Sequence, residues 1–290
     1  MQPDHNHQKK IAVINDLAGF GRCSIAAALP VISALGIQCC PLPTSIFSNH
    51  TGFDSFFFED YTDKMQPYID EWKKLGLQFA GISSGFLGSK EQIQIVIRFF
   101  EEFGTPDNII VVDPVMGDYG KPYSTYTMEM CEEMKRLTRY ADILTPNLTE
   151  ACILTDTPYH EDKWNMKEIE ALVEKLGAMG PEKIVVTGIV QGDFIANYCY
   201  EKGKAGKIRR THKVGTQRSG TGDIFAAIIA ADAVNGVPFD ESVRRASLFI
   251  KKCIRRSVEL DLPLTDGVCF EEVLHALKPR NVGKKQRAEA

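Results

Sequence analysis

The sequence predicts an α/β fold, a three-layer α/β/α sandwich with a mostly parallel central sheet. Short, almost continuous apolar runs alternate with longer stretches of helical composition along most of the 290 residues. Each apolar run ends in a polar or glycine-containing loop, which is typical of parallel strands covered by helices on both faces. No internal repeat or linker divides the chain, so we expect a single domain over residues 10–278.

The first predicted elements are a strand, a glycine loop and a helix. Residues 11–14 form an apolar run before two polar residues, as a buried strand would. Two glycines within residues 19–21 allow a bend, and residues 24–35 are rich in alanine, leucine and isoleucine, which suits a helix. Residues 39–58 are rich in Pro, Ser, Thr and Phe, which predicts extended structure or a lid.

The strand pattern then recurs, whereas the last part of the chain has a different pattern. Four further strands share an apolar run followed by a polar or glycine-bearing loop: residues 79–83, 109–112, 143–144 and 184–186. A helix is predicted over residues 90–103. The last part predicts an antiparallel pair joined by a turn at 203–206 and then two long helices, over residues 194–200, 208–214, 223–235 and 239–260.

Composition and charge exclude several classes of protein. Hydrophobic residues make up 44% and charged residues 25% of the chain, and the net charge is -4, so binding to nucleic acid by counterion release is not expected. Eight scattered cysteines without paired spacing predict reduced thiols and a cytoplasmic location. No apolar run reaches the roughly 18 residues of a membrane span. We expect a mobile polar arm at residues 1–9 and a basic flexible tail at residues 279–290.

Polar residues follow the predicted strands at the edge where ligands bind in such folds. Ligands of open α/β sheets sit outside the carboxyl ends of the strands. Five polar residues fall at these ends: Asp16, Ser83, Asp113, Asn147 and Thr187. We therefore expect a small-molecule site there.

A glycine-rich turn opens the predicted helix at residues 223–235. It reads Ser219-Gly220-Thr221-Gly222-Asp223, and it brings free backbone N–H groups to the positive end of the helix dipole. A phosphate fits such a turn, and Asp223 beside it could act as a base. Phosphoryl transfer needs this positioning and charge stabilisation. The plain alternative is an aspartate that only stabilises the start of a helix.

Three carboxylates could organise a metal–nucleotide complex. Magnesium keeps much of its hydration shell, so carboxylates often hold it through water. The candidates are Asp113, Asp118 and Glu150. Asn147 and Glu150 could instead form only a helix capping box. The GxxxxGK[ST] pattern of P-loops and the signatures of protein kinases are absent from the sequence.

Five segments in this order resemble the ribokinase-like (PfkB-type) kinases, and more closely their pyridoxal kinase branch. They span most of residues 10–277: TSIFSNHT from Thr44, SGFLGS from Ser84, DPVMGD from Asp113, PNLTE from Pro146 and GTGD from Gly220. The resemblance implies phosphorylation of the 5′-hydroxymethyl group of pyridoxal, pyridoxine or pyridoxamine by ATP and Mg²⁺. It suggests a homodimer and leaves open a monovalent cation such as K⁺.

The resemblance also implies roles for individual residues. Asp223 would be the general base, and the turn from Ser219 through Gly220 and Thr221 to Gly222 would form the anion hole. The phosphate tail, nucleotide and magnesium would be held by Asp113, Asp118, Asn147, Glu150 and Thr187. The pocket for the vitamin would be lined by Asp16, Thr44, His50 and Phe86, although His50 could also be a core histidine. Residues 117–127 correspond to a flap over the nucleotide, or to an ordinary surface loop.

Two departures bear on the vitamin end of the site. Pyridoxal kinases commonly have a serine where this chain has Asp16, and a tyrosine where it has Phe86. An aspartate could pair with the ring nitrogen or a charged aminomethyl group. We therefore expect pyridoxamine or pyridoxine to be used at least as well as pyridoxal.

Three other functions stay open at this stage. Hydroxymethylpyrimidine kinase shares the fold, but that branch usually carries a cysteine within the motif that reads Gly-Thr-Gly-Asp here. A sugar or nucleoside kinase ranks lower, because the N-terminal Gly-Gly signature of sugar kinases is missing. A non-catalytic module that binds pyridoxal phosphate would keep the pocket but would not need Asp223 as a base.

Overall fold

A nine-stranded, mostly parallel sheet forms the centre of the protein. The computed structural model describes residues 3–123 and 125–279. The order of the strands is β11-β10-β9-β8-β5-β4-β1-β2-β3, with β3, β10 and β11 antiparallel to their neighbours. The strands are β1 (Lys10–Ala18), β2 (Gln38–Phe47), β3 (Phe58–Asp60), β4 (Gly81–Ser84), β5 (Ile109–Val112), β8 (Ile143–Leu144), β9 (Lys183–Gln191), β10 (Phe194–Glu201) and β11 (Lys207–His212). A separate two-stranded hairpin consists of β6 (Gly117–Asp118) and β7 (Lys121–Pro122).

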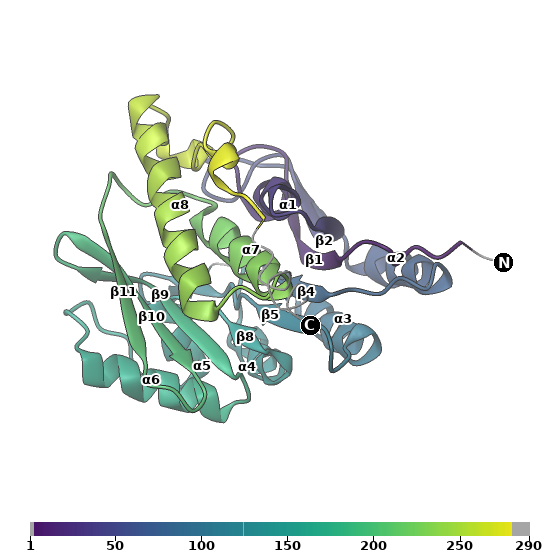
Figure 1. The fold of residues 1–290 in the computed structure, drawn as a ribbon, viewed down its shortest axis with the longest axis horizontal. Helices are drawn as coiled ribbons and strands as arrows, with labels where there is room; N and C mark the ends of the chain where they lie inside the picture. Colours follow the sequence, from purple (N-terminus) through teal and green to yellow (C-terminus); the bar gives the residue numbers. More distant parts are fainter. Residues whose placement is uncertain (1–2, 124, 280–290) are drawn as a thin grey trace, which may run out of the picture.

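Helices cover both faces of the sheet (Figure 1). One face carries α1 (Ser24–Ala34), α7 (Thr221–Val234) and α8 (Phe239–Glu259). The opposite face carries α2 (Thr62–Lys74), α3 (Lys90–Phe103), α4 (Met128–Leu137), α5 (Leu148–Leu154) and α6 (Met166–Ala178). Short 3₁₀ turns occur at η1 (Thr138–Tyr140), η2 (Leu264–Asp266) and η3 (Leu274–Ala276).

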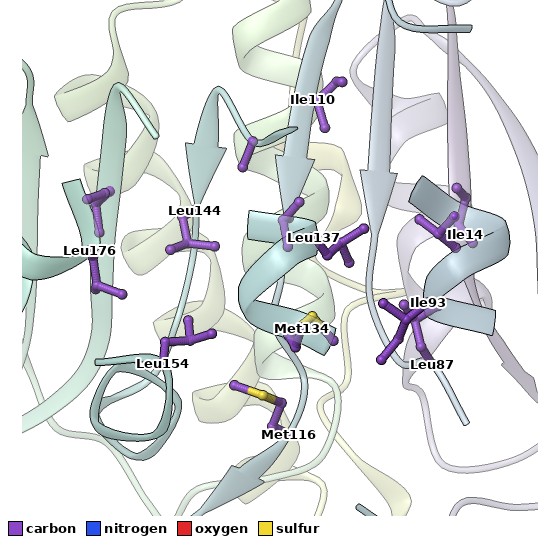
Figure 2. Close-up of a cluster of buried hydrophobic side chains, with 14 of the residues drawn as sticks. Ile14, Leu87, Ile93, Ile110, Met116, Met134, Leu137, Leu144, Leu154 and Leu176 are labelled. Atoms are coloured by element: carbon purple, nitrogen blue, oxygen red, sulfur yellow. The ribbon is translucent and has the colours of Figure 1, made fainter. Parts of the chain in front are cut away.

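Two hydrophobic cores hold the three layers together. Alternate side chains of β1 enter opposite cores: Ile14 packs toward α3, and Val13 packs toward α1 and α7. Figure 2 shows part of the first core, in which Ile14, Leu87 and Ile93 meet near α3, and Met116 lies near Met134. Both faces of each central strand are therefore buried, which explains why these strands read as continuous apolar runs.

The predicted fold class is confirmed, and several elements have the predicted bounds. The helix at Lys90–Phe103 and the strands at Ile109–Val112 and Ile143–Leu144 agree with prediction. Two strands are longer than predicted. β1 continues to Ala18 with a register shift between Asn15 and Leu17, and β9 continues to Gln191 because it also pairs with the antiparallel strand β10. The first nine residues of the 39–58 segment form strand β2 rather than a lid.

The predicted arm, domain and tail remain predictions. Within the described part of the predicted arm, the Asn6 side chain donates to the carbonyl of Gly76 and accepts from the N–H of Gln78. Of the predicted tail, residues 280–290 lie outside the described residues. Among the helices that the structure describes, none is both long and apolar enough to cross a membrane.

A buried ion pair joins α7 to α8, which lie side by side in Figure 1. The Asp232 carboxylate is fully buried and accepts from the Arg245 guanidinium at 2.6 Å and from the Ser242 hydroxyl at 3.1 Å. The pair fixes the packing of α8 on the C-terminal end of α7.

We expect Arg245→Ala to lower the free energy of unfolding by about 3 kcal/mol, because it leaves a buried carboxylate without its cation. Urea denaturation measures the change. Arg256→Ala on the same helix is the matched control, since Arg256 pairs with Glu259 and Glu272 at the surface and should matter little. Equal effects of the two substitutions would contradict this assignment.

Candidate active site

The turn that opens α7 is built around a glycine that no other residue could replace without strain. Gly220 is the residue before α7 and has φ +81°, in the left-handed region. A Cβ at this position would lie 1.9 Å from the carbonyl oxygen of Arg22, and one at Gly267 would lie 2.3 Å from that of Gly21. The backbone of three segments therefore meets closely here, and the turn presents its free N–H groups at the positive end of the helix.

Asp223 lies in the first turn of α7, beside this glycine turn. Asn15 on β1 donates from its side-chain amide to Oδ1 of Asp223 at 3.1 Å. Burial raises the pKa of the Asp223 carboxyl, while hydrogen bonds from the Ser24 backbone and from Asn15 lower it. Asp223 is thus fixed in place and has more affinity for a proton than an exposed aspartate, as suits a general base.

Asp113 directly follows β5 and lies next to the start of α7. A Cβ on Gly222 would come within 3.9 Å of its Oδ2 atom. Thr145 donates its hydroxyl to Oδ1 of Asp113 at 3.0 Å. Burial raises the pKa of Asp113 to about 7, and the nearby charge of Asp223 adds to this increase. The structure therefore brings the two aspartates together, although 110 positions separate them in the sequence.

Glu150 and Asn147 form the capping box that the sequence suggested, and Glu150 also faces the acidic cluster. Each side chain accepts from the other residue's backbone N–H, and Glu150 accepts a second bond, from the N–H of Met116 at 3.2 Å. Burial, followed by the charge of Asp113, raises the pKa of Glu150 well above its usual value. Glu150 therefore both caps the start of α5 and interacts with the charge of Asp113.

The β6–β7 hairpin lies over this end of the site, in the segment expected to be a flap. Asp118 on β6 accepts from the Gln217 side-chain amide at 3.1 Å, and the Tyr119 hydroxyl donates to the Gln217 carbonyl oxygen at 3.0 Å. Burial raises the pKa of Asp118. The Asn147 amide donates to the carbonyl of Gly117 at 2.9 Å. Gln217, which sequence reasoning missed, thus joins the hairpin to the segment before the glycine turn.

Thr187 lies within β9 rather than after it. It forms an isolated parallel bridge with Asn147, and its N–H donates to the carbonyl of Pro146 at 2.9 Å. Thr187 therefore neighbours the Asn147 side of the site, as expected of a nucleotide contact.

Three of the residues expected to line the vitamin lie on β1, on β2 and in the loop after β4, and the structure brings the last two into contact. Burial raises the pKa of Asp16 to about 7; hydrogen bonding to the Ser24 side chain opposes this, and the charge of Asp223 adds to it. Thr44 is fully buried, and its hydroxyl donates to the carbonyl of Phe86 at 3.0 Å. Phe86 packs edge-on against Phe47, with ring centres 6.3 Å apart.

His50 has both ring nitrogens engaged. Nδ1 accepts from the N–H of Gly52 at 3.0 Å, so Nε2 carries the proton and donates to the carbonyl of Thr265 at 2.7 Å. The ring also packs closely on Gly21, where a Cβ would lie 2.2 Å from Cδ2. His50 therefore ties the segment after β2 to η2 and to the glycine loop after β1.

Comparison with known proteins places these features in a family. The sequence model of the family described as phosphomethylpyrimidine kinase matches residues 21–264. The pyridoxine/pyridoxal/pyridoxamine kinase of Bordetella avium is 27% identical over 268 residues, which cover 85% of this chain and 86% of that enzyme.

Solved structures agree with this assignment. A candidate phosphomethylpyrimidine kinase from Bacteroides thetaiotaomicron superposes with a TM-score of 0.91 and 39% identity over 94% of both chains. Its orthorhombic form with pyridoxal gives 0.89 and 38%, over 93% of this chain and 95% of that one. The pyridoxal kinase of Lactobacillus plantarum gives 0.85 and 26%, over 92% and 96%. With a family match over most of its length and the same fold, this chain is a ribokinase-like kinase and belongs to the phosphomethylpyrimidine kinase family.

Proposed function

We propose that this protein phosphorylates the 5′-hydroxymethyl group of a vitamin B6 vitamer with ATP. The observation that carries the proposal is the position of Asp223, which stands at the amide-rich start of α7 with Asp113 beside the same turn. A base, an anion-binding turn and a carboxylate able to serve a metal meet at this point. Phosphoryl transfer requires this combination.

In the proposed reaction, Asp223 accepts the proton of the substrate hydroxyl. The freed oxygen electron pair forms a bond to the γ-phosphorus of ATP, and the bond between that phosphorus and the bridging oxygen breaks, so that ADP leaves. The N–H groups of the turn from Ser219 to Gly222 stabilise the charge on the transferring phosphoryl oxygens. The raised pKa of Asp223 lets it accept the proton more readily than an exposed aspartate would.

The carboxylates near this turn would hold magnesium through water, because among the described residues no group of three or more carboxylate, histidine or cysteine side chains is placed to hold a metal ion directly. Asp113, Asp118 and Glu150 supply oxygen donors; burial raises the pKa of each, and the charge of Asp113 raises that of Glu150 further. A divalent ion held through water by these residues would neutralise the charge of the ATP phosphates. Asn147 and Thr187 would hold the nucleotide, and the β6–β7 hairpin would exclude water from it.

Asp16 marks the vitamin end of the proposed site. The Bacteroides thetaiotaomicron protein, 38% identical, has been crystallised with pyridoxal, which supports a B6 vitamer as the ligand. Asp16 is buried, and its pKa of about 7 would fall if a cationic group of the substrate came beside it. Pyridoxamine carries such a group on its aminomethyl arm, and every vitamer has a ring nitrogen that can take a proton.

Hydroxymethylpyrimidine kinase is the second candidate, because the matching family model is that of phosphomethylpyrimidine kinases. Both substrates are aromatic rings with a hydroxymethyl group, so the same base and turn would serve either. A coupled assay of ADP release against the three vitamers, hydroxymethylpyrimidine and ribose separates the two candidates. If none of the five compounds causes release of ADP, neither candidate is supported and the proposal is overturned.

We expect Asp223→Asn to lower turnover on the order of 10² or more, because an amide cannot accept the hydroxyl proton. Binding of ADP, measured by calorimetry, should persist. Asp240→Asn is the matched control. Asp240 also lies in the first turn of a helix, α8, but its carboxylate is paired with Lys207 and Arg209. Unchanged turnover of Asp223→Asn would remove this residue from the chemistry.

We expect pyridoxamine or pyridoxine to be used at least as well as pyridoxal, and Asp16→Ser to lower kcat/KM most for pyridoxamine. The physical reason is the loss of a buried carboxylate that can face a cationic group. The measurement is kcat/KM for the three vitamers with both proteins. A strong preference for pyridoxal that survives the substitution would show that Asp16 does not select the substrate.

A further inference from the structure

Asn15 connects the proposed base to the vitamin side of the site. It lies on β1 and is 6% exposed. Its side-chain oxygen accepts from the N–H of Asp16 at 3.0 Å and from the N–H of Phe86 at 2.9 Å, while its Nδ2 donates to Oδ1 of Asp223 at 3.1 Å. One side chain thus contacts the base and the backbone of two residues expected to line the vitamin.

The partners of Asn15 determine how its amide is turned. Only the side-chain oxygen of Asn15 can accept hydrogen bonds from the two backbone N–H groups. The NH₂ group must therefore face the Asp223 carboxylate. An aspartate at position 15 would set a second carboxylate against Asp223, and a leucine would provide neither donor nor acceptor. The chemistry of the three contacts therefore calls for an amide here.

The surroundings leave Asn15 little freedom to move. A Cβ on Gly85 would lie 2.5 Å from Nδ2 of Asn15, so the backbone of the loop after β4 packs directly on the amide. The peptide groups of Phe86 are held from both sides, because Asn15 accepts from its N–H and the Thr44 hydroxyl donates to its carbonyl. A continuous set of hydrogen bonds runs from Asp223 through Asn15 and Phe86 to Thr44.

We propose that Asn15 is a positioning residue that fixes the Asp223 carboxylate relative to the backbone of Phe86, so that the base meets the substrate hydroxyl. The inference rests on the proposed function, since it requires Asp223 to act on a bound hydroxyl. Without the amide, the carboxylate could rotate about its own side-chain bonds, and fewer encounters with the hydroxyl would have the geometry for proton transfer.

A double-mutant cycle in the full chain tests this role. We expect Asn15→Ala to lower kcat by about 10- to 100-fold, as loss of a hydrogen bond to a charged group does, while the KM for ATP changes by less than about 3-fold. In the Asp223→Asn background the same substitution should lower kcat no further, because the two residues act as a unit. A residue that only stabilises the fold would have the same effect in both backgrounds.

Two further variants separate positioning from folding. Gly85→Ala would displace the Asn15 amide without changing Asn15, and should give the same loss of kcat. Asn108→Ala is the matched control: Asn108 is also 6% exposed, and its side chain bonds the backbone of Phe103 and Thr105 before β5, away from the carboxyl ends of the strands. It should lower the unfolding temperature and leave kcat at moderate temperature unchanged. Thermal unfolding and ADP binding show that each variant is folded.

The proposal is overturned if Asn15→Ala lowers kcat by the same factor with and without Asp223, or if it raises KM alone. It is also overturned if Gly85→Ala, folded and able to bind ADP, keeps the turnover of the unmodified protein. If Asp223→Asn itself keeps full turnover, Asp223 is not the base and the inference about Asn15 fails, although the protein still acts as a kinase. If the unmodified protein phosphorylates no vitamer, the proposed function fails, and the inference about Asn15 fails with it.

Discussion

The crowding of carboxylates at one edge of the parallel sheet is the constraint around which this site is organised. Parallel strands all end at the same edge, so residues that follow different strands meet there. Asp16, Asp113 and Glu150 reach this edge from β1, β5 and the start of α5, and Asp223 reaches it from α7. Burial raises the pKa of all four carboxyl groups, and repulsion from a neighbouring carboxylate adds to the increase for Asp16, Asp113 and Glu150.

Hydrogen-bond donors make this crowding tolerable. Thr145 donates to Asp113, the backbone of Met116 and Asn147 donates to Glu150, and Asn15 donates to Asp223. These bonds favour the charged forms, while burial and repulsion oppose them. These carboxyl groups therefore bind protons more readily than exposed ones, and an approaching cation would lower their pKa and displace the protons into solvent. A cluster of this kind is suited to bind a cation.

The sequence allowed the sheet and the glycine turn before α7 to be predicted, because both rest on local patterns. Apolar runs marked the buried strands, and the glycines before a helical stretch marked the turn at Gly220. The helix α6 was missed although its signals are present: Asn165 and Glu168 form a capping box, and its apolar residues recur at helical spacing. Asn15 and Gln217 could not have been assigned, because their partners lie about 70 to 210 positions away along the chain.

The close backbone contacts around Gly220 and Gly267 have a consequence for how this protein can change over evolution. Where carbonyl oxygens of one loop touch the α-carbons of another, no side chain can be added, and no single substitution can reshape the floor of the site. At Asp16, Phe86 and His50, which we propose to line the vitamin, the contacts are made by side chains and can be exchanged one residue at a time. A kinase built in this way can acquire a new alcohol substrate while its phosphate-handling part stays unaltered.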